Sequence, residues 1–174
     1  MIVTGRLVIR PFSLNDAAES FTWFGDSEVM KFVPNGPDKN RMQTESRLIN
    51  YIKHYETLGY SKYVITDKKD GKLIGDCGIL AIENTGLNEL GYRITRESWG
   101  NGFATEAAIG VLNHTFRTLK FNEIHAIIES ENIVSKYIAE SKLGFSRNGN
   151  IYCHGCDFEL YRLGSENFMN YTTS

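Results

Sequence analysis

Two glycines stand at the start of an expected helix in the segment Trp99–Glu106, which reads Trp-Gly-Asn-Gly-Phe-Ala-Thr-Glu. The first N–H groups of a helix lack partners within the helix and carry a partial positive charge. Glycine lets such a backbone approach a phosphate closely, because no side chain intervenes. The segment therefore predicts a cradle for a phosphate-bearing cofactor.

Three kinds of phosphate site compete for this turn. A P-loop would need a lysine after the glycines, and none follows. A dinucleotide-binding turn fits Gly100 and Gly102, with Glu123 or Glu129 as the ribose-binding acid, but Thr105 occupies its third glycine position. The strands expected before the turn are antiparallel, which a dinucleotide-binding fold does not supply. The third candidate is the pyrophosphate turn of an acyl-coenzyme A transferase.

The segment Cys153-His154-Gly155-Cys156 has the spacing of half a metal site or of a redox pair. A structural zinc needs four ligands, and Cys77 is the only other cysteine in the chain. Because the segment lies between two strand-like runs, we interpret it as a hairpin with two small, partly buried thiols. His125 lies in an apolar strand and is expected to be a packed core residue.

The elements that position these residues form one continuous pattern with no linker. Turn signals around residues 70–71 and 84–86 predict that the central strands run antiparallel, and strands and helices alternate after them. This order predicts an α+β domain with a mixed sheet. The expected strands cover residues 7–10, 60–66, 72–82, 88–95, 123–129, 146–152 and 157–163, and the expected helices cover 13–24, 40–58, 104–119 and 133–143.

Composition limits the classes of function. The 174 residues include 19 basic and 21 acidic side chains without a block of Lys or Arg, which argues against a nucleic-acid partner. No segment has the apolar length of a signal peptide or membrane span, so no membrane partner is expected. Three cysteines, an odd number, argue against a secreted disulfide framework. We expect one cytoplasmic domain over residues 1–174, with a polar tail that frays from about residue 164.

Five short motifs, taken in order, identify a family. The chain resembles the GNAT superfamily of acetyl-coenzyme A-dependent N-acetyltransferases, and within it the RimJ/RimL type that acetylates N-terminal amines of ribosomal proteins. The superfamily turn Q/R-x-x-G-x-G/A is matched by Gly102 and Ala104, while Trp99 replaces the Gln or Arg, as is usual in this branch. The motifs are Gly5–Pro11, Leu73–Gly75, Glu89–Ile94, Trp99–Ala107 and Lys142–Phe145.

The resemblance implies the GNAT fold. It consists of a mixed, mostly antiparallel sheet of about seven strands flanked by about four helices. The fourth strand is expected to splay from the fifth, opening a V-shaped cleft.

The resemblance also implies acetyl-coenzyme A as the acyl donor and no metal. Pantetheine is expected to pair with backbone groups of Arg93 and Ile94, and Asn132 matches the family Asn that hydrogen-bonds the pantetheine arm. Ser135 follows three residues later, where the branch commonly carries Ser. The pyrophosphate is expected on the backbone N–H groups of Gly100, Asn101, Gly102, Phe103, Ala104 and Thr105.

Acetyl transfer needs a neutral amine, a polarised thioester and a stabilised or protonated leaving thiolate. Glu89, in the fourth strand, is the candidate base, with a water chain or a merely structural carboxylate as alternatives. Ser135 is the candidate acid, because counting back from the Leu-Gly-Phe motif puts Glu140 where many members carry Tyr. The spacing from Asn132 to Gly144 is one residue longer than usual, which predicts a bulge around residues 140–141.

The acceptor is not determined by the sequence. The implied reaction is direct attack of a primary amine in a ternary complex, and the amine is either the N-terminal α-amine of a protein or peptide or a small amine. The alternative is a non-catalytic acyl-coenzyme A-binding or sensor module on the same fold. The chain is expected to be a monomer or a homodimer. Aromatic candidates for the acceptor side, with core packing as their alternative role, are Trp23, Phe32, Tyr51 and Tyr55.

Overall fold

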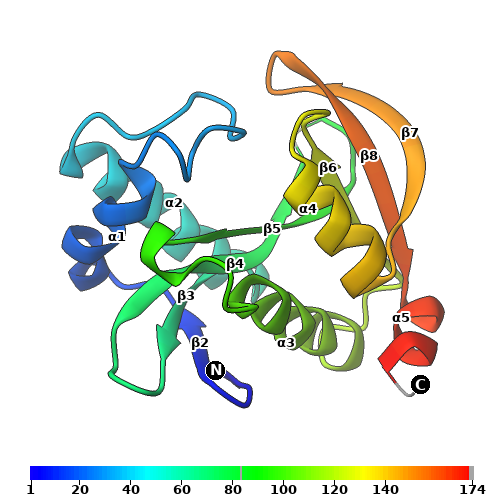
Figure 1. The fold of residues 1–174 in the computed structure, drawn as a ribbon, viewed down its shortest axis with the longest axis horizontal. Helices are drawn as coiled ribbons and strands as arrows, with labels where there is room; N and C mark the ends of the chain where they lie inside the picture. Colours follow the sequence, from blue (N-terminus) through cyan, green and yellow to red (C-terminus); the bar gives the residue numbers. More distant parts are fainter. Residues whose placement is uncertain (83, 173–174) are drawn as a thin grey trace.

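A computed structural model describes residues 1–82 and 84–172, with side chains to residue 168. Eight described strands form one sheet with helices on both faces (Figure 1). The strand order is β1-β2-β3-β4-β5-β6-β8-β7, and every neighbouring pair is antiparallel except β5 and β6. The strands are β1 (Ile2–Val3), β2 (Leu7–Pro11), β3 (Lys62–Asp67), β4 (Leu73–Ala81), β5 (Asn88–Ile94), β6 (Glu123–Ile128), β7 (Ser146–Cys153) and β8 (Cys156–Gly164).

Local capping signals fix the helix ends where the sequence predicts them. Ser13 and Asp16 form a capping box, and the Asn40 side chain accepts a hydrogen bond from the Gln43 N–H. Gly59 ends the second helix in the left-handed conformation, with φ 78°. The helices are α1 (Ala17–Phe24), α2 (Arg41–Leu58), α3 (Phe103–Arg117), α4 (Ile133–Tyr137) and α5 (Ser165–Thr172), with 3₁₀ turns η1 (Leu14–Asp16) and η2 (Arg96–Ser98) and a π-helical turn η3 (Ile138–Lys142).

Alternating side chains divide the core between the two faces of the sheet. One face packs against α3 and the α4–η3 segment through the largest apolar cluster, which includes Ile65, Ile79, Val111, Leu112 and Ala139. The other face packs against α1 and α2 through Trp23, Phe24, Leu48 and Val64. Each face of the central strands therefore has its own helical layer.

The parallel strands β5 and β6 are the one irregular junction of the sheet. They pair at a single position, where Glu89 stands opposite His125, and then diverge (Figure 1). Beyond that position, β5 continues to Ile94 with its outer backbone edge unpaired. The splay expected between the fourth and fifth predicted strands is confirmed here, between β5 and β6. A doubly wound dinucleotide-binding sheet is excluded, because β2 to β5 are joined by antiparallel pairs.

The structure departs from the predicted elements at both ends of the chain. Strand β1 is an additional two-residue strand, too short to leave a periodic signal. Residues 165–172, expected to fray as a polar tail, instead form α5. Phe168 explains the difference, because its ring is fully buried 5.3 Å from the ring of Phe116. One apolar anchor therefore orders an otherwise polar segment.

The longer spacing after Asn132 is accommodated inside a helix. The expected bulge near residues 140–141 takes the form of the π-helical turn η3, which follows α4 without a break. A π turn accommodates one extra residue without a loop. Ala139 and Leu143 both stay buried in the main core.

A buried ion pair connects the helices α1 and α2 to the sheet. Arg93 of β5 donates to Asp76 of β4 through Nε at 2.9 Å and Nη2 at 2.8 Å. The indole Nε1 of Trp23 donates to the same carboxylate at 3.0 Å, and Nη2 of Arg93 also reaches the hydroxyl of Tyr51 at 3.2 Å. Asp76 is completely buried, so this network connects α1, α2, β4 and β5 away from water.

We expect Asp76→Ala to lower the free energy of unfolding by about 3–5 kcal/mol, because it leaves the Arg93 guanidinium buried without a counter-charge. Chemical denaturation measures the change. The matched control is Asp157→Ala, which removes an exposed carboxylate from β8. A small loss for Asp76→Ala, similar to that of the control, would contradict the structural role given to this pair.

Candidate active site

The predicted phosphate turn lies between the end of β5 and the start of α3. Gly100 and Gly102 both adopt left-handed backbone conformations, with φ 75° and 76°. The first hydrogen bond of α3 runs from the Glu106 N–H to the Gly102 carbonyl. The N–H groups of residues 103–105 therefore precede the helix ladder and are available to an anion. The turn has the backbone arrangement that its glycines predicted.

Side chains within the turn hold it in this shape. The indole Nε1 of Trp99 donates to the Ile94 carbonyl at 2.7 Å, which ties the turn to the last residue of β5. The Asn101 amide donates to the carbonyls of Ser98 at 3.2 Å and Trp99 at 3.0 Å. The turn is therefore preorganised before any ligand arrives, and the Asn101 side chain serves the turn itself.

Glu106 connects the turn to the N-terminal segment. Its carboxylate accepts hydrogen bonds from the Thr4 hydroxyl at 2.6 Å and from the Arg6 N–H and Nε at 2.7 and 2.6 Å. Arg6 Nη1 in turn donates to the Asn101 carbonyl at 2.9 Å. Burial raises the pKa of Glu106, but the bonds from Thr4 and Arg6 outweigh it and lower the pKa overall. Glu106 is thus ionised, and its role is structural: it links the N-terminal segment to the start of α3.

A groove of about 670 Å³ opens beside the turn. Thr105, Ile109 and Asn113 line it from one side of α3, spaced four residues apart. Thr4 borders it on the N-terminal side, and Lys142 of η3 supplies a positive charge. The groove therefore continues from the phosphate turn along α3.

Arg93 and Ile94, predicted to pair with pantetheine, lie on β5 beyond its last contact with β6. The Arg93 side chain is committed to Asp76 on the opposite face, so only its main chain faces the splay. Both residues thus offer backbone donors and acceptors along an open strand edge, as the predicted pairing requires.

Asn132 and Ser135 lie together at the start of α4. Asn132 Oδ1 accepts from the Ser135 N–H at 3.1 Å and caps the helix. The cap occupies the amide oxygen, and no described residue accepts from the Asn132 Nδ2. The predicted bond to a pantetheine carbonyl is therefore compatible with Nδ2 as the donor.

Tyr92 is a residue that the sequence reasoning missed. It lies on β5, partly buried against the α3-side core, and its hydroxyl is close enough to the Ser135 side chain on α4 for Ser135 to lower its pKa. Burial raises the pKa of Tyr92 strongly, which outweighs the lowering by Ser135 and keeps the phenol protonated. The pair bridges the region where β5 and β6 diverge. The alternation of β5 placed Tyr92 on this face, but its partner required the fold.

Glu89 lies on the other face of β5, at the position where β5 and β6 part. Burial raises the pKa of this carboxyl, and electrostatic interactions with Lys62, His154 and Arg93 act in the opposite direction without cancelling the rise. A half-buried carboxylate with a raised pKa is suited to accept a proton near neutral pH. The candidate base and the Tyr92–Ser135 pair thus flank the splay from opposite faces of the sheet.

The side chains near residue 140, where many family members carry a catalytic Tyr, do not lie at the splay. Glu140, at the place of the usual Tyr, is exposed, and Tyr137 is 54% exposed with its ring 5.4 Å from the Lys142 ammonium. Neither side chain is buried in the core. Ser135 and Tyr92 are therefore the hydroxyl groups that this structure places at the splay.

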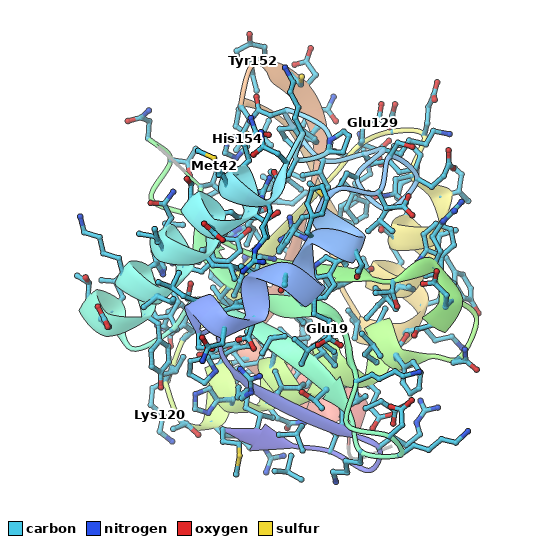
Figure 2. The ribbon with its side chains drawn as sticks, turned by 90° about the vertical axis from the view of Figure 1, so that its left-hand side faces the viewer. Glu19, Met42, Lys120, Glu129, Tyr152 and His154 are labelled. Carbon is cyan, nitrogen blue, oxygen red and sulfur yellow. The ribbon has the colours of Figure 1, made fainter. Side chains whose placement is uncertain are left out.

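The aromatic candidates for the acceptor side divide into two groups. Trp23 and Tyr51 are buried in the α1–α2 core, and Tyr55 packs edge-on against Tyr63, so these three belong to the core. Phe32 stays partly exposed in the segment between α1 and α2. Figure 2 shows Met42, near the start of α2, at the same end of the molecule as His154 and Tyr152 of the β7–β8 hairpin.

The remaining sequence candidates have structural roles. His154 and Gly155 form the two-residue turn of the β7–β8 hairpin, with Cys153 opposite Cys156, which confirms the hairpin. The expectation of two partly buried thiols was wrong for Cys156, which is exposed, whereas Cys153 is buried. His125 is buried, as expected for a core residue. Within residues 1–82 and 84–172, no group of three His, Cys, Asp or Glu side chains is arranged to hold a metal, and no described helix is long and apolar enough to cross a membrane.

A glycine turn at the start of α3 and a sheet that splays between β5 and β6 are features that the sequence led us to expect of a GNAT acetyltransferase. The family model described as "Acetyltransferase (GNAT) domain" matches residues 6–146. The chain belongs to this family of GNAT acetyltransferases.

Relatives cover most of the chain. YkkB, an uncharacterized Bacillus subtilis protein, is 34% identical over 147 residues, which span 82% of this chain and 83% of YkkB. An uncharacterized N-acetyltransferase from Bacillus licheniformis, p20, is 32% identical over 150 residues, 85% of this chain and 83% of p20.

Solved structures share the fold. A GNAT-family acetyltransferase from Bacillus anthracis superposes with a TM-score of 0.81 at 24% identity and covers 95% of this chain and 98% of its own. A spermidine N-acetyltransferase from Vibrio cholerae, in complex with CoA and spermine, has a TM-score of 0.78 at 20% identity over 95% and 99% of the two chains. A ribosomal-protein-S5-alanine acetyltransferase from Vibrio fischeri has a TM-score of 0.77 at 18% identity over 95% and 97%.

We expect Gly100→Ala to weaken coenzyme A binding about tenfold, which is about 1.4 kcal/mol. No atom lies within 4 Å of the added methyl group, so the effect arises from the positive φ alone. Gly86→Ala is the matched control, because Gly86 has φ 73° and equal space at the other end of β5. Both variants are expected to lose about 1–2 kcal/mol of stability. Calorimetry that finds equal coenzyme A affinity in the two variants would contradict a binding role for the turn.

Proposed function

We propose that this protein transfers an acetyl group from acetyl-coenzyme A to a primary amine. The observation that carries the proposal is the position of two features, the glycine turn and the Glu89 carboxylate, on either side of the opening between β5 and β6. The preorganised phosphate turn leads to it from the α3 face, and the Glu89 carboxylate lies at its other face. Donor and acceptor would thus approach the same opening from opposite sides of the sheet.

The donor would be held mainly by the backbone. The N–H groups from Gly100 to Thr105 would bind the pyrophosphate, and the free edge at Arg93 and Ile94 would pair with pantetheine. The groove along α3, with Lys142 at its border, offers the nucleotide end a surface next to the turn. Asn132 would donate to the pantetheine arm. The Vibrio cholerae spermidine N-acetyltransferase in complex with CoA supports coenzyme A use on this fold.

The proposed acetyl transfer would use side chains on both faces of the sheet. Glu89 accepts a proton from the acceptor ammonium, directly or through water, and the neutral nitrogen attacks the thioester carbonyl. The carbon–sulfur bond breaks as the carbon–nitrogen bond forms. The departing thiolate receives a proton from the hydroxyl pair of Ser135 and Tyr92, and the second proton that the nitrogen loses as the amide forms returns to that pair, so neither hydroxyl is left deprotonated. A carboxylate and two hydroxyls therefore supply both proton transfers.

An N-terminal α-amine is the acceptor that this base can deprotonate at the lowest free-energy cost. Its pKa is about 7.7–8.0, so neutralising it at pH 7 costs about 1 kcal/mol, whereas a lysine amine with a pKa of about 10.4 costs about 4–5 kcal/mol. The fold similarity to a ribosomal-protein-S5-alanine acetyltransferase is consistent with the RimJ/RimL branch. We propose an α-amine acceptor, on a peptide or on a small molecule, and a cytoplasmic location consistent with the three free cysteines.

The alternative is a module that binds acyl-coenzyme A without turnover. A thiol-release assay with acetyl-coenzyme A and a panel of amines separates the two, and we expect free coenzyme A with at least one α-amine. Calorimetry runs in parallel to establish that acetyl-coenzyme A binds. Binding without release of thiol for any amine would reject the enzyme and favour the module.

We expect Glu89→Gln to lower kcat by about 10²–10⁴-fold while acetyl-coenzyme A still binds. Because the base must be ionised, wild-type kcat/KM is expected to fall as pH decreases through the raised pKa of Glu89, and this acidic limb is lost in the variant. Glu56→Gln, at an exposed position of α2, is the control. An unchanged kcat and pH profile in Glu89→Gln would assign the base to a water chain instead.

A further inference from the structure

Lys62 is a buried lysine on the α1–α2 face of the sheet. It is the first residue of β3 and is only 4% exposed. In the register of the sheet, Lys62 pairs with Gly78 of β4, and Gly78 pairs with Gly91 of β5. A methyl group at Gly91 would overlap the Lys62 Nζ. The lysine side chain therefore crosses the glycine of β4, and its ammonium ends against the backbone of β5.

This position brings the ammonium close to the Glu89 carboxylate. Gly91 and Glu89 are alternate residues of β5, so they share one face at a spacing of about 7 Å along the strand. Burial raises the pKa of Glu89, and of the charged groups that act in the opposite direction Lys62 has the largest effect. Lys62 is therefore a counter-charge for Glu89, held in place by the packing of three strands.

Two other cations act on Glu89 more weakly than Lys62 does. Arg93 shares its charge with Asp76, whose carboxylate oxygen lies 2.8 Å from Arg93 Nη2. His154 lies on the exposed turn of the β7–β8 hairpin, where water and salt screen its effect. Neither cation therefore matches a buried ammonium that has no closer carboxylate partner of its own.

Two further titratable side chains near Glu89 are held neutral. His125 stands opposite Glu89 on β6, and burial, the largest influence on it, lowers its pKa. Burial likewise raises the pKa of the Cys153 thiol on β7, and the Glu89 charge raises it further. The balance between the neutral and ionised forms of Glu89 is therefore set mainly by its burial and by Lys62.

We propose that Lys62 is a positioning residue for the proposed base, whose fixed ammonium keeps Glu89 in the carboxylate form that accepts a proton from the amine. The inference rests on the proposed acetyl transfer and deepens it, because it assigns the group that makes a half-buried acid usable as a base. A carboxyl group removed from water takes up a proton unless an opposite charge nearby favours the ionised form.

The first experiment measures kcat/KM by thiol release, as a function of pH, in wild type and in Lys62→Met with one α-amine acceptor. Methionine keeps the length of the side chain, and an apolar replacement of a buried charge is often neutral or stabilising. Loss of the ammonium raises the pKa of Glu89, so the acidic limb is expected to move to higher pH by about one unit or more.

The ratio of kcat/KM in Lys62→Met to that in wild type isolates this effect, because the titration of the acceptor amine is common to both. The ratio is expected to be about tenfold below one at acidic pH and to return to about one at alkaline pH, where Glu89 is ionised in both enzymes. A loss of packing alone would lower the ratio equally at every pH.

The second experiment titrates the Glu89 carboxyl itself and needs no turnover. In protein labelled with ¹³C-glutamate, the Glu89 signal is assigned by its loss in Glu89→Gln, and NMR follows its midpoint. The midpoint is expected to rise in Lys62→Met by the shift seen in the acidic limb. The control is Lys53→Met, at an exposed position of α2, which is expected to keep both the wild-type midpoint and the wild-type pH profile. Should Lys62→Met fail to fold, Lys62→Gln takes its place.

A ratio that does not change with pH, or a Glu89 midpoint that is the same in wild type and Lys62→Met, would overturn the inference and leave acetyl transfer intact. Wild type that releases no thiol with any amine would instead overturn the proposed function, and with it the base that Lys62 is proposed to serve.

Discussion

The buried ion pair between Asp76 and Arg93 is the constraint on which the arrangement of this molecule depends. A guanidinium and a carboxylate that are both removed from water must stay together, because either one alone would be strongly unfavourable. Trp23 and Tyr51 complete the network, so α1 and α2 are fixed to β4 and β5 by the same charges. The Arg93 side chain is thereby held on the α1–α2 face of the sheet. Its main chain is left on the open edge of β5, where the donor is expected to bind.

This division of one strand between two faces explains how the site is organised. Odd-numbered positions of β5 carry Glu89, Gly91 and Arg93 toward α1 and α2, and even-numbered positions carry Tyr92 and its neighbours toward α3 and α4. The proposed proton acceptor and the proposed proton donors are therefore separated by the thickness of a single strand. Because β6 parts from β5 after one paired position, the separation can be bridged by two ligands that meet in the opening.

Much of this architecture is local in origin and can be predicted from the sequence. The glycine turn at residues 100–102, the capping residues Ser13 and Asn40, and the alternation along β5 are each encoded within a few neighbouring residues. The features that escaped prediction depend on contacts distant in sequence. Glu106 meets Arg6 across 100 residues, and Lys62 reaches Gly91 only because three strands stand in a particular register. Helix α5 was missed because a single buried ring, Phe168, outweighs the polarity of its segment.

The π-helical turn at Ile138–Lys142 has a consequence for how this fold can vary. An added residue within a helix would normally rotate everything after it by about 100°. Here the wide turn absorbs it, so Leu143 remains in the core and Lys142 remains at the groove. The π turn therefore lets the length of this segment change while its two ends keep their positions. A change of one residue in the length of this segment can be accommodated while Leu143 stays in the core and Lys142 stays at the groove along α3.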